Sequence, residues 1–338
     1  MITDNPREEF KQTLVGYLQN AELTDISGSL QRLSMNITPP VLYRYRKCTP
    51  RHFAELESEA LSFSAPAVFE DDLDDAFVSM SEDRIKDMEA LATGQLFPFF
   101  SELMEMNLED CSVALSEALL PTHSPISDLF DGIIPPQQVW KNEDYIGMAI
   151  EDKACCINEV FGTITRMISA KDACNRIRRQ TKVSCLCEVS DSEEMWNEYG
   201  GHGTGFQLEY IRDSLFGMGS CAGTIPLIFP VIYEAERPDM SELAMMIALQ
   251  DAGFQFLPGD TPIQRHWFAS MLKAIYIKGA ARYSHEQEWR VVIPDQTINE
   301  TAFRFSTRLC PAGRIRLGKY ICSQNEDKLR TIAAKLDV

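Results

Sequence analysis

The chain of 338 residues lacks a long uncharged apolar run. The longest such stretch, residues 222–233, is interrupted by Pro226 and Pro230, whereas a helix that spans a bilayer needs about 20 apolar residues. The first residues are polar and acidic, unlike the apolar segment of a secretory signal. We therefore expect a cytoplasmic protein that makes no contact with membranes.

Positive charge is also scarce, because 32 Lys and Arg residues stand against 50 Asp and Glu residues, which gives a net charge of −18. Proteins that bind nucleic acids generally present a basic surface to the phosphates, so this balance argues against a nucleic-acid partner. It disfavours an anionic membrane surface for the same reason. A local basic pocket remains compatible with it.

Several signatures of common catalytic and metal sites are missing. The ten cysteines include no C-x-x-C pair, so the spacing of zinc ribbons and redox motifs is absent. The chain has no H-E-x-x-H, no G-x-S-x-G and no Walker A motif. An acidic loop at 65–80 lacks the oxygen spacing and central glycine of a calcium loop. We predict no metal site.

What is present is the composition of an ordinary globular protein, with 45% apolar and 24% charged residues. At about 150 residues per domain, the length suggests two domains or one domain with a large insertion. Helical spacing of leucines predicts two helices within 7–36, and aromatic and β-branched residues predict a strand at 41–46. Thr49 and Pro50 are typical of a helix start.

After residue 181 the pattern becomes rich in strands. We expect strands at 61–64, 182–188, 205–210, 224–233, 288–293 and 315–321, and helices at 192–199, 240–251, 262–281 and 325–335. The order shows no regular βαβ rhythm, which favours an α+β fold with a mixed, mostly antiparallel sheet. We predict a helical N-terminal segment (1–40), a core domain (41–80 and 181–338) and a large helical insertion (81–180). The glycine-rich run at 200–205 follows a helix and precedes a strand, which indicates a helix end and a turn.

Three short segments carry candidate chemistry. Arg44 stands between two tyrosines on the first strand and offers a bidentate fork for an anion. Ser62 and Ser64 share one face of the second strand. Glu286 and Glu288 are also two residues apart, and carboxylates this close raise each other's pKa, which is useful in a site. Any one segment alone is also compatible with a solvated surface strand and weak ion pairs.

The segments, taken in order, resemble a widespread, largely bacterial family catalogued as domain of unknown function 2971. The pieces that carry the resemblance are Leu42-Tyr43-Arg44-Tyr45, Leu61–Phe69, Met195–Tyr199, Gly205–Glu209, Val231–Tyr233 and Glu286–Arg290. Residues 70–74 depart from the family pattern, which usually reads Asn-Asp-Pro-Phe-Asp there. Tyr283 stands where the family often has tryptophan.

The order Arg, Ser-x-Ser, Glu-x-Glu is, more distantly, similar to that of ADP-ribosyltransferases that use NAD. This resemblance implies that NAD is the substrate, that Arg44 holds its diphosphate or ribose, and that Ser62 or Ser64 supports the nicotinamide pocket. It implies that Glu288 bonds the ribose 2′-hydroxyl and stabilises the oxocarbenium-like transition state, with Glu286 orienting the acceptor. Tyr283 or Tyr45 would stack on a ring. A role as a toxin or phage-defence effector follows by analogy alone.

Two other functions are compatible with the residues. The first is a non-catalytic binding or regulatory module, in which the insertion at 81–180 contacts a protein partner. The second is a metal-dependent hydrolase or nuclease that combines the acidic loop with Glu286 and Glu288. The enzyme hypothesis requires that Arg44, Ser64 and Glu288 converge on one concave pocket.

Overall fold

The computed structural model describes residues 5–19, 26–66, 182–222, 226–235, 272–278, 281–292, 304–307 and 310–336. All of them belong to one of the two compact units of the chain, namely Met1–Phe77, Arg178–Pro238 and Leu272–Val338. Residues 67–80 of the predicted acidic loop, the insertion at 81–180 and the helix at 240–251 lie outside the described residues.

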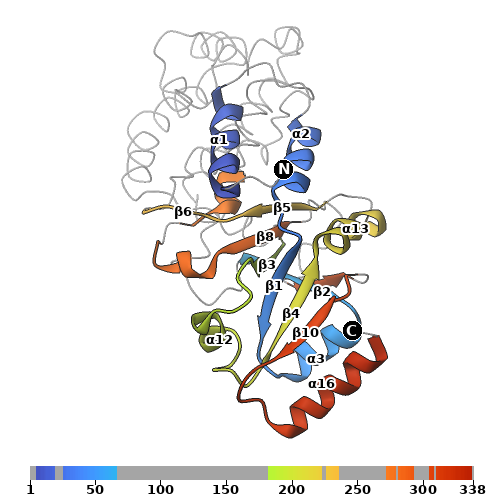
Figure 1. Ribbon diagram of the computed structural model, residues 1–338. Helices are drawn as coiled ribbons and strands as arrows, with labels where there is room; N and C mark the ends of the chain where they lie inside the picture. Colours follow the sequence, from blue (N-terminus) through green and yellow to red (C-terminus); the bar gives the residue numbers. More distant parts are fainter. Residues whose placement is uncertain are drawn as a thin grey trace, which may run out of the picture. The chain divides into compact units, whose positions relative to one another are not determined.

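The described part of the chain has helices around a mostly antiparallel sheet, consistent with the predicted α+β class (Figure 1). One sheet has the strand order β10-β4-β1-β3-β2-β9, and β8 joins it through β3 and carries β5 on its other edge. The strands are β1 (Val41–Arg46), β2 (Leu61–Ser64), β3 (Val183–Cys187), β4 (Phe206–Ile211), β5 (Leu227–Pro230), β8 (Glu288–Val292), β9 (Arg304–Thr307) and β10 (Arg314–Leu317). A short parallel pair joins β6 (Ile232–Tyr233) to β7 (Ile277–Lys278).

The N-terminal helices α1 (Pro6–Gln19) and α2 (Ile26–Ile37) pack against β5 (Figure 1). Phe10 of α1 stacks on Phe229 at 4.2 Å between ring centroids, and Tyr276 meets both rings edge-on. The Ser34 hydroxyl of α2 donates to the Ile228 carbonyl at 2.8 Å. Residues of the predicted segment 1–40 are therefore tied to the sheet by an aromatic core and a buried hydrogen bond.

The helix α3 (Pro50–Glu57) begins as the sequence predicts, because the Thr49 side chain accepts a hydrogen bond from the His52 main-chain N–H. Its Phe53 stacks on Phe206 of β4. The C-terminal helix α16 (Ser323–Leu336) packs beside α3 and buries Leu329 (Figure 1). Through Phe53, α3 therefore packs on β4, the strand that pairs with β1.

The short helix α12 (Glu193–Glu198) begins at Ser192, whose hydroxyl accepts from the Met195 N–H. It ends in the glycine-rich run, where Gly201, His202 and Gly203 adopt positive φ angles. The Gly203 N–H donates to the Trp196 carbonyl, which closes the helix end. The prediction of a helix end and turn is confirmed.

The structure also differs from several expectations. The strand expected at 224–233 is divided into β5 and β6, with Val231 between them. The helix expected at 262–281 gives way to β7 at Ile277–Lys278 and to the 3-10 helix η3 (Ala281–Glu286). Helix α13 (Arg212–Ala222) and strand β9 were not expected. In the part of the chain that the structure describes, no helix is long and apolar enough to cross a bilayer.

Candidate functional site

A cavity of about 490 Å³ brings together the residues that the sequence singled out. The residues that line it include all seven candidates, Arg44, Tyr45, Ser62, Ser64, Tyr283, Glu286 and Glu288. They come from β1, β2, η3 and β8, which lie far apart in the sequence. The convergence that the enzyme hypothesis requires is therefore present.

The cavity lies where the sheet opens beside β3. Strand β8 pairs with β3 along its whole length and occupies one edge. The other edge is shared, because β1 meets β3 at Cys187 and β2 meets it at Val183. Between these two ends β1 and β2 are apart, and the Arg44 guanidinium crosses to donate to the Ser62 carbonyl at 3.2 Å. The edge of β3 between its pairings with β1 and β2, together with long basic side chains such as that of Arg44, therefore forms the wall of the cavity.

The two glutamates reach the cavity by different routes. Glu288 begins β8, in agreement with the strand expected at 288–293, whereas Glu286 ends η3. Gln287 between them has a positive φ of 43°, which turns the chain between the two elements. The two carboxylates still meet at one centre, because each of them contacts the Lys278 ammonium group.

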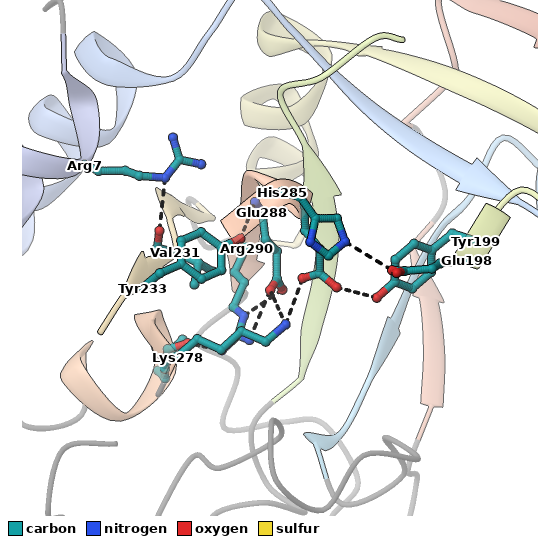
Figure 2. Close-up of polar contacts among 11 residues, drawn as sticks. Arg7, Glu198, Tyr199, Val231, Tyr233, Lys278, His285, Glu288 and Arg290 are labelled. Atoms are coloured by element: carbon teal, nitrogen blue, oxygen red, sulfur yellow. Dashed lines mark hydrogen bonds and ion pairs between the residues drawn. The ribbon is translucent and has the colours of Figure 1, made fainter. Parts of the chain in front are cut away.

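Glu288 forms the more strongly paired carboxylate of the two (Figure 2). Arg290 donates to it through Nε at 2.8 Å and Nη2 at 3.3 Å, and Lys278 Nζ lies 3.6 Å away. The Glu288 main-chain N–H donates to the Tyr233 hydroxyl at 2.8 Å. Arg290 is itself fixed by donating to the Ile275 carbonyl. The carboxylate is thereby held in one orientation from two sides.

Glu286 is held by one cation and one hydroxyl. Lys278 Nζ donates to Oε2 at 2.8 Å, and the Tyr199 hydroxyl donates to Oε1 at 2.6 Å. Only 4% of Glu286 is exposed. The Lys278 ammonium also lies over the Tyr283 ring, 4.3 Å from its centroid. This contact places Tyr283 at the same centre.

The surroundings drive the pKa values of the two carboxyl groups apart. Glu288 is buried, but Arg290 and Lys278 outweigh that burial and lower its pKa to about 2. For Glu286, burial and the neighbouring charge of Glu288 outweigh the attraction of Lys278 and raise its pKa. One carboxylate therefore stays ionised, while the other is suited to exchanging a proton nearer neutral pH. Such divergent pairs are typical of acid–base sites.

Another part of the lining is basic. Arg44 and Arg46 from β1 and Arg51 from α3 all line the cavity. Arg46 donates to the Ser62 hydroxyl at 3.2 Å, and Arg51 pairs with Glu55 at 2.8 Å. Burial above all, together with repulsion by Arg44, lowers the pKa of Arg46 to about 9, so it remains a cation at neutral pH.

Arg44 has spare capacity for a ligand. Among the described residues, no carboxylate oxygen lies within ion-pair distance of its guanidinium group, and its buried Nε has no hydrogen-bond partner. Buried polar groups without partners are uncommon in native proteins, and a bound ligand is one explanation for them. An anion between β1 and β2 would satisfy both the charge and the free donor.

Overall charge in the lining is opposite to that of the chain. Among the described residues that line it, five side chains are cationic and two are carboxylates, namely Arg44, Arg46, Arg51, Lys278 and Arg290 against Glu286 and Glu288. The whole chain carries a net charge of −18. A basic cavity in an acidic protein attracts anionic small molecules without creating a basic outer surface.

The tyrosines of the cavity have different surroundings. Tyr45 is 3% exposed, its ring meets Trp196 edge-on at 5.0 Å, and its hydroxyl donates to the Val189 carbonyl. Burial raises its pKa to about 12. Tyr283 is only half-buried. Tyr283 is therefore the better placed of the two to stack on a ligand ring.

The opposite face of β8 is closed by a second polar cluster. Trp289 is fully buried, as expected for the core side of this strand, and its indole N–H donates to Glu188 at 2.7 Å. The other oxygen of Glu188 accepts from Arg7 of α1 at 2.6 Å, and Arg7 Nε donates to the Val231 carbonyl (Figure 2). Helix α1 thus supports the strand that carries Glu288.

Sequence reasoning missed several lining residues. Tyr199 ends the helix expected at 192–199, and no pattern there indicates a site. Arg46, Arg51 and His52 are of residue types that are common near the start of a helix. Lys278 falls in the helix expected at 262–281, where a lysine is compatible both with a cation near a helix end and with a pocket residue. Its contact with Glu286 depends on η3 folding back over β7.

A metal centre finds no support in this part of the molecule. Within the described ranges, no group of three His, Cys, Asp or Glu residues could hold an ion. Glu286 and Glu288 already contact Lys278 and Arg290, which supply their positive charge. The acidic loop at 65–80 lies almost entirely outside the described residues.

Comparison with known proteins adds no assignment, since no family model, curated protein or solved structure matches the chain.

Proposed function

We propose that this cavity binds NAD and that the protein cleaves its nicotinamide–ribose bond, as an ADP-ribosyltransferase-like or NAD-cleaving enzyme. The observation that carries the proposal is the basic cavity with two carboxylates of divergent pKa at one centre. The distant resemblance of the order Arg, Ser-x-Ser, Glu-x-Glu to that of ADP-ribosyltransferases is consistent with it. A toxin or phage-defence role rests on that resemblance alone.

The basic part of the cavity supports binding of the diphosphate. Arg44 has no carboxylate partner among the described residues and keeps one unsatisfied donor. A guanidinium fork matches phosphate oxygens and forms charge-assisted hydrogen bonds with them. Ser62 and Ser64 of β2 lie next to it on the cavity wall and add hydroxyl groups. Tyr283 offers a ring for stacking.

The carboxylate centre supports cleavage of the glycosidic bond. When that bond breaks, its electron pair leaves with nicotinamide and positive charge develops on the ribose. Glu288, ionised and fixed by Arg290, is a preorganised negative group that stabilises this charge. Glu286 has a raised pKa and can take the proton of the attacking acceptor.

A metal-dependent hydrolase is less well supported, because both carboxylates are already paired with protein cations. The non-catalytic binding module remains the alternative, and its expected contact region at 81–180 lies outside the described residues. The two hypotheses differ in whether the cavity takes a nucleotide.

Thermal-shift titration with NAD tests the binding step. A ligand at 100 times its Kd stabilises the folded state by about 2.7 kcal/mol, so a saturable rise in Tm is expected. Arg44→Ala should lose this rise. Arg314→Ala is the matched control, because it removes the same charge from a residue on β10 that is mostly exposed. No rise in the native chain at millimolar NAD, or an equal rise in Arg44→Ala, would contradict the proposed site.

A further inference from the structure

The geometry points to water as the acceptor, so that the products are nicotinamide and free ADP-ribose rather than an ADP-ribosylated macromolecule. This inference rests on the proposed cleavage of NAD and specifies its second substrate. It is drawn from the surroundings of Glu286, the carboxylate that faces the acceptor, and from the depth of the carboxylate centre.

Glu286 is poorly placed to receive a side chain from another protein. One of its oxygens accepts from Tyr199 and the other from Lys278, and 4% of the residue is exposed. A guanidinium acceptor binds a carboxylate most strongly in fork geometry, and the hydrogen bonds from Tyr199 and Lys278 to the two oxygens disfavour that geometry. A lysine acceptor would have to bring a second ammonium group beside Lys278, which like-charge repulsion disfavours.

Glu288 is equally deep, with 6% of the residue exposed. The reacting ribose carbon must lie close to this carboxylate if Glu288 is to stabilise its charge. A cavity of about 490 Å³ is within the range that small-molecule ligands fill. A dinucleotide would fill much of a cavity of this size, and the low exposure of both carboxylates favours a small acceptor such as water over a side chain of another protein.

Glu286 can still activate that water. An ionised carboxylate has about four acceptor positions, and the two hydrogen bonds that Glu286 accepts leave others available. The water oxygen attacks the ribose carbon as the bond to nicotinamide breaks, and the electron pair of that bond leaves with nicotinamide. The water proton passes to Glu286 and then to solvent. The balance is NAD and water to nicotinamide, ADP-ribose and one proton.

The protonation of Glu286 has identifiable controls. Burial and Glu288 raise its pKa, whereas Lys278 and the Tyr199 hydroxyl act in the opposite direction. The groups that interact electrostatically with it come from five elements or their ends: Lys278 of β7, Tyr199 after α12, Glu288 of β8, Cys187 of β3 and Tyr233 of β6. Tyr199→Phe removes the hydroxyl without removing the ring, so it should raise the pKa of Glu286 further.

The test measures both products formed from NAD by the full chain, in the presence of a cell lysate as a source of acceptors. The expected result is one molecule of free ADP-ribose for each molecule of nicotinamide released, with no ADP-ribose attached to protein. Glu286→Gln should lower the rate about 100-fold or more, the usual effect of losing a general base. Tyr199→Phe should shift the rising limb of the pH–rate profile to higher pH.

The possible outcomes distinguish the claim that the protein cleaves NAD from the claim that water is the acceptor. Nicotinamide release with ADP-ribose attached to protein, and a corresponding deficit of free ADP-ribose, would overturn water as the acceptor and leave NAD cleavage standing. An unchanged pH profile in Tyr199→Phe, or full activity in Glu286→Gln, would overturn the role of Glu286. If no nicotinamide is released by the native chain, both claims fail. Melting curves of each variant show whether it is folded.

Discussion

Replacing Lys278 by methionine is the sharpest test of the buried charge cluster. Its ammonium group lies 2.8 Å from Glu286 and 3.6 Å from Glu288, and all three residues are buried. Methionine keeps most of the side-chain volume but leaves two buried carboxylates with Arg290 as their remaining close cation. Breaking a buried ion pair in this way costs about 3–5 kcal/mol of unfolding free energy.

The unfolding free energy that Lys278→Met removes should depend on pH. In the native chain the pKa of Glu286 lies above its ordinary value of 4.5. The folded state therefore holds this proton more tightly than the unfolded state, and the stability contributed by the group falls as pH rises from 4.5 towards the raised pKa. Without Lys278 that pKa rises further. The destabilisation caused by Lys278→Met should accordingly be larger at about pH 8 than at about pH 5.

Urea unfolding at the two pH values, followed by circular dichroism, measures this difference. Lys11→Met is the matched control, because it breaks the ion pair with Glu234 at 2.5 Å, in which both side chains are more than a third exposed. An exposed pair contributes up to about 1 kcal/mol. A loss in Lys278→Met no larger than in the control, or equal losses at both pH values, would refute the description of the centre as a buried, coupled charge cluster.

Two further predictions concern the elements that hold β1 in place. Gly205→Ala should destabilise the protein by about 1–3 kcal/mol through overpacking, because an added Cβ would lie 2.0 Å from the Arg46 carbonyl oxygen. Gly217→Ala is its control, since no atom lies within 4 Å of the added Cβ and alanine favours the helix; a comparable loss there would contradict the packing argument. Thr49→Ala should cost about 1 kcal/mol in urea unfolding through loss of the hydrogen bond from the His52 N–H, whereas Thr49→Ser should be close to neutral. Equal losses in both Thr49 variants would exclude the capping explanation.

The elements that were predicted correctly have strong local signals. Thr49 and Pro50 mark the start of α3, and alternating aromatic and basic residues mark β1 over Val41–Arg46. Ser192 caps α12, and positive φ angles at Gly201 and Gly203 turn the chain into β4. In each case the preference of a few neighbouring residues agrees with the tertiary structure.

The unexpected elements depend on partners that are distant in the sequence. The sequence predicts a helix over 262–281, but β7 forms near its end because Ile277 and Lys278 pair with β6 in parallel register. Strand β9 pairs with β2, although the long segment between them includes the whole of the predicted insertion. Such pairings contribute little to local sequence patterns, because strand preference depends on neighbouring strands and on burial.

In the candidate site, too, some residues have local sequence signals and others depend on contacts between distant elements. The sequence indicated Arg44 and the two glutamates because their residue types and spacing are suited to chemistry. It could not indicate that Tyr199 and Lys278 bond the two oxygens of Glu286, since these contacts require α12, β7 and η3 to meet. The divergence of the two carboxyl pKa values is a tertiary effect, although the pair itself is local.

The central claim is that Glu288 takes part in cleaving NAD, and the most direct measurement is nicotinamide release by the purified chain and by Glu288→Gln. We expect release that saturates with NAD in the native chain and is abolished in Glu288→Gln. Because the Glu288→Gln substitution would leave Arg290 without its charged partner, Glu288→Asp, which keeps the charge, is measured beside it with a melting curve for each. No release by the native chain, or undiminished release by a folded Glu288→Gln, would contradict the claim.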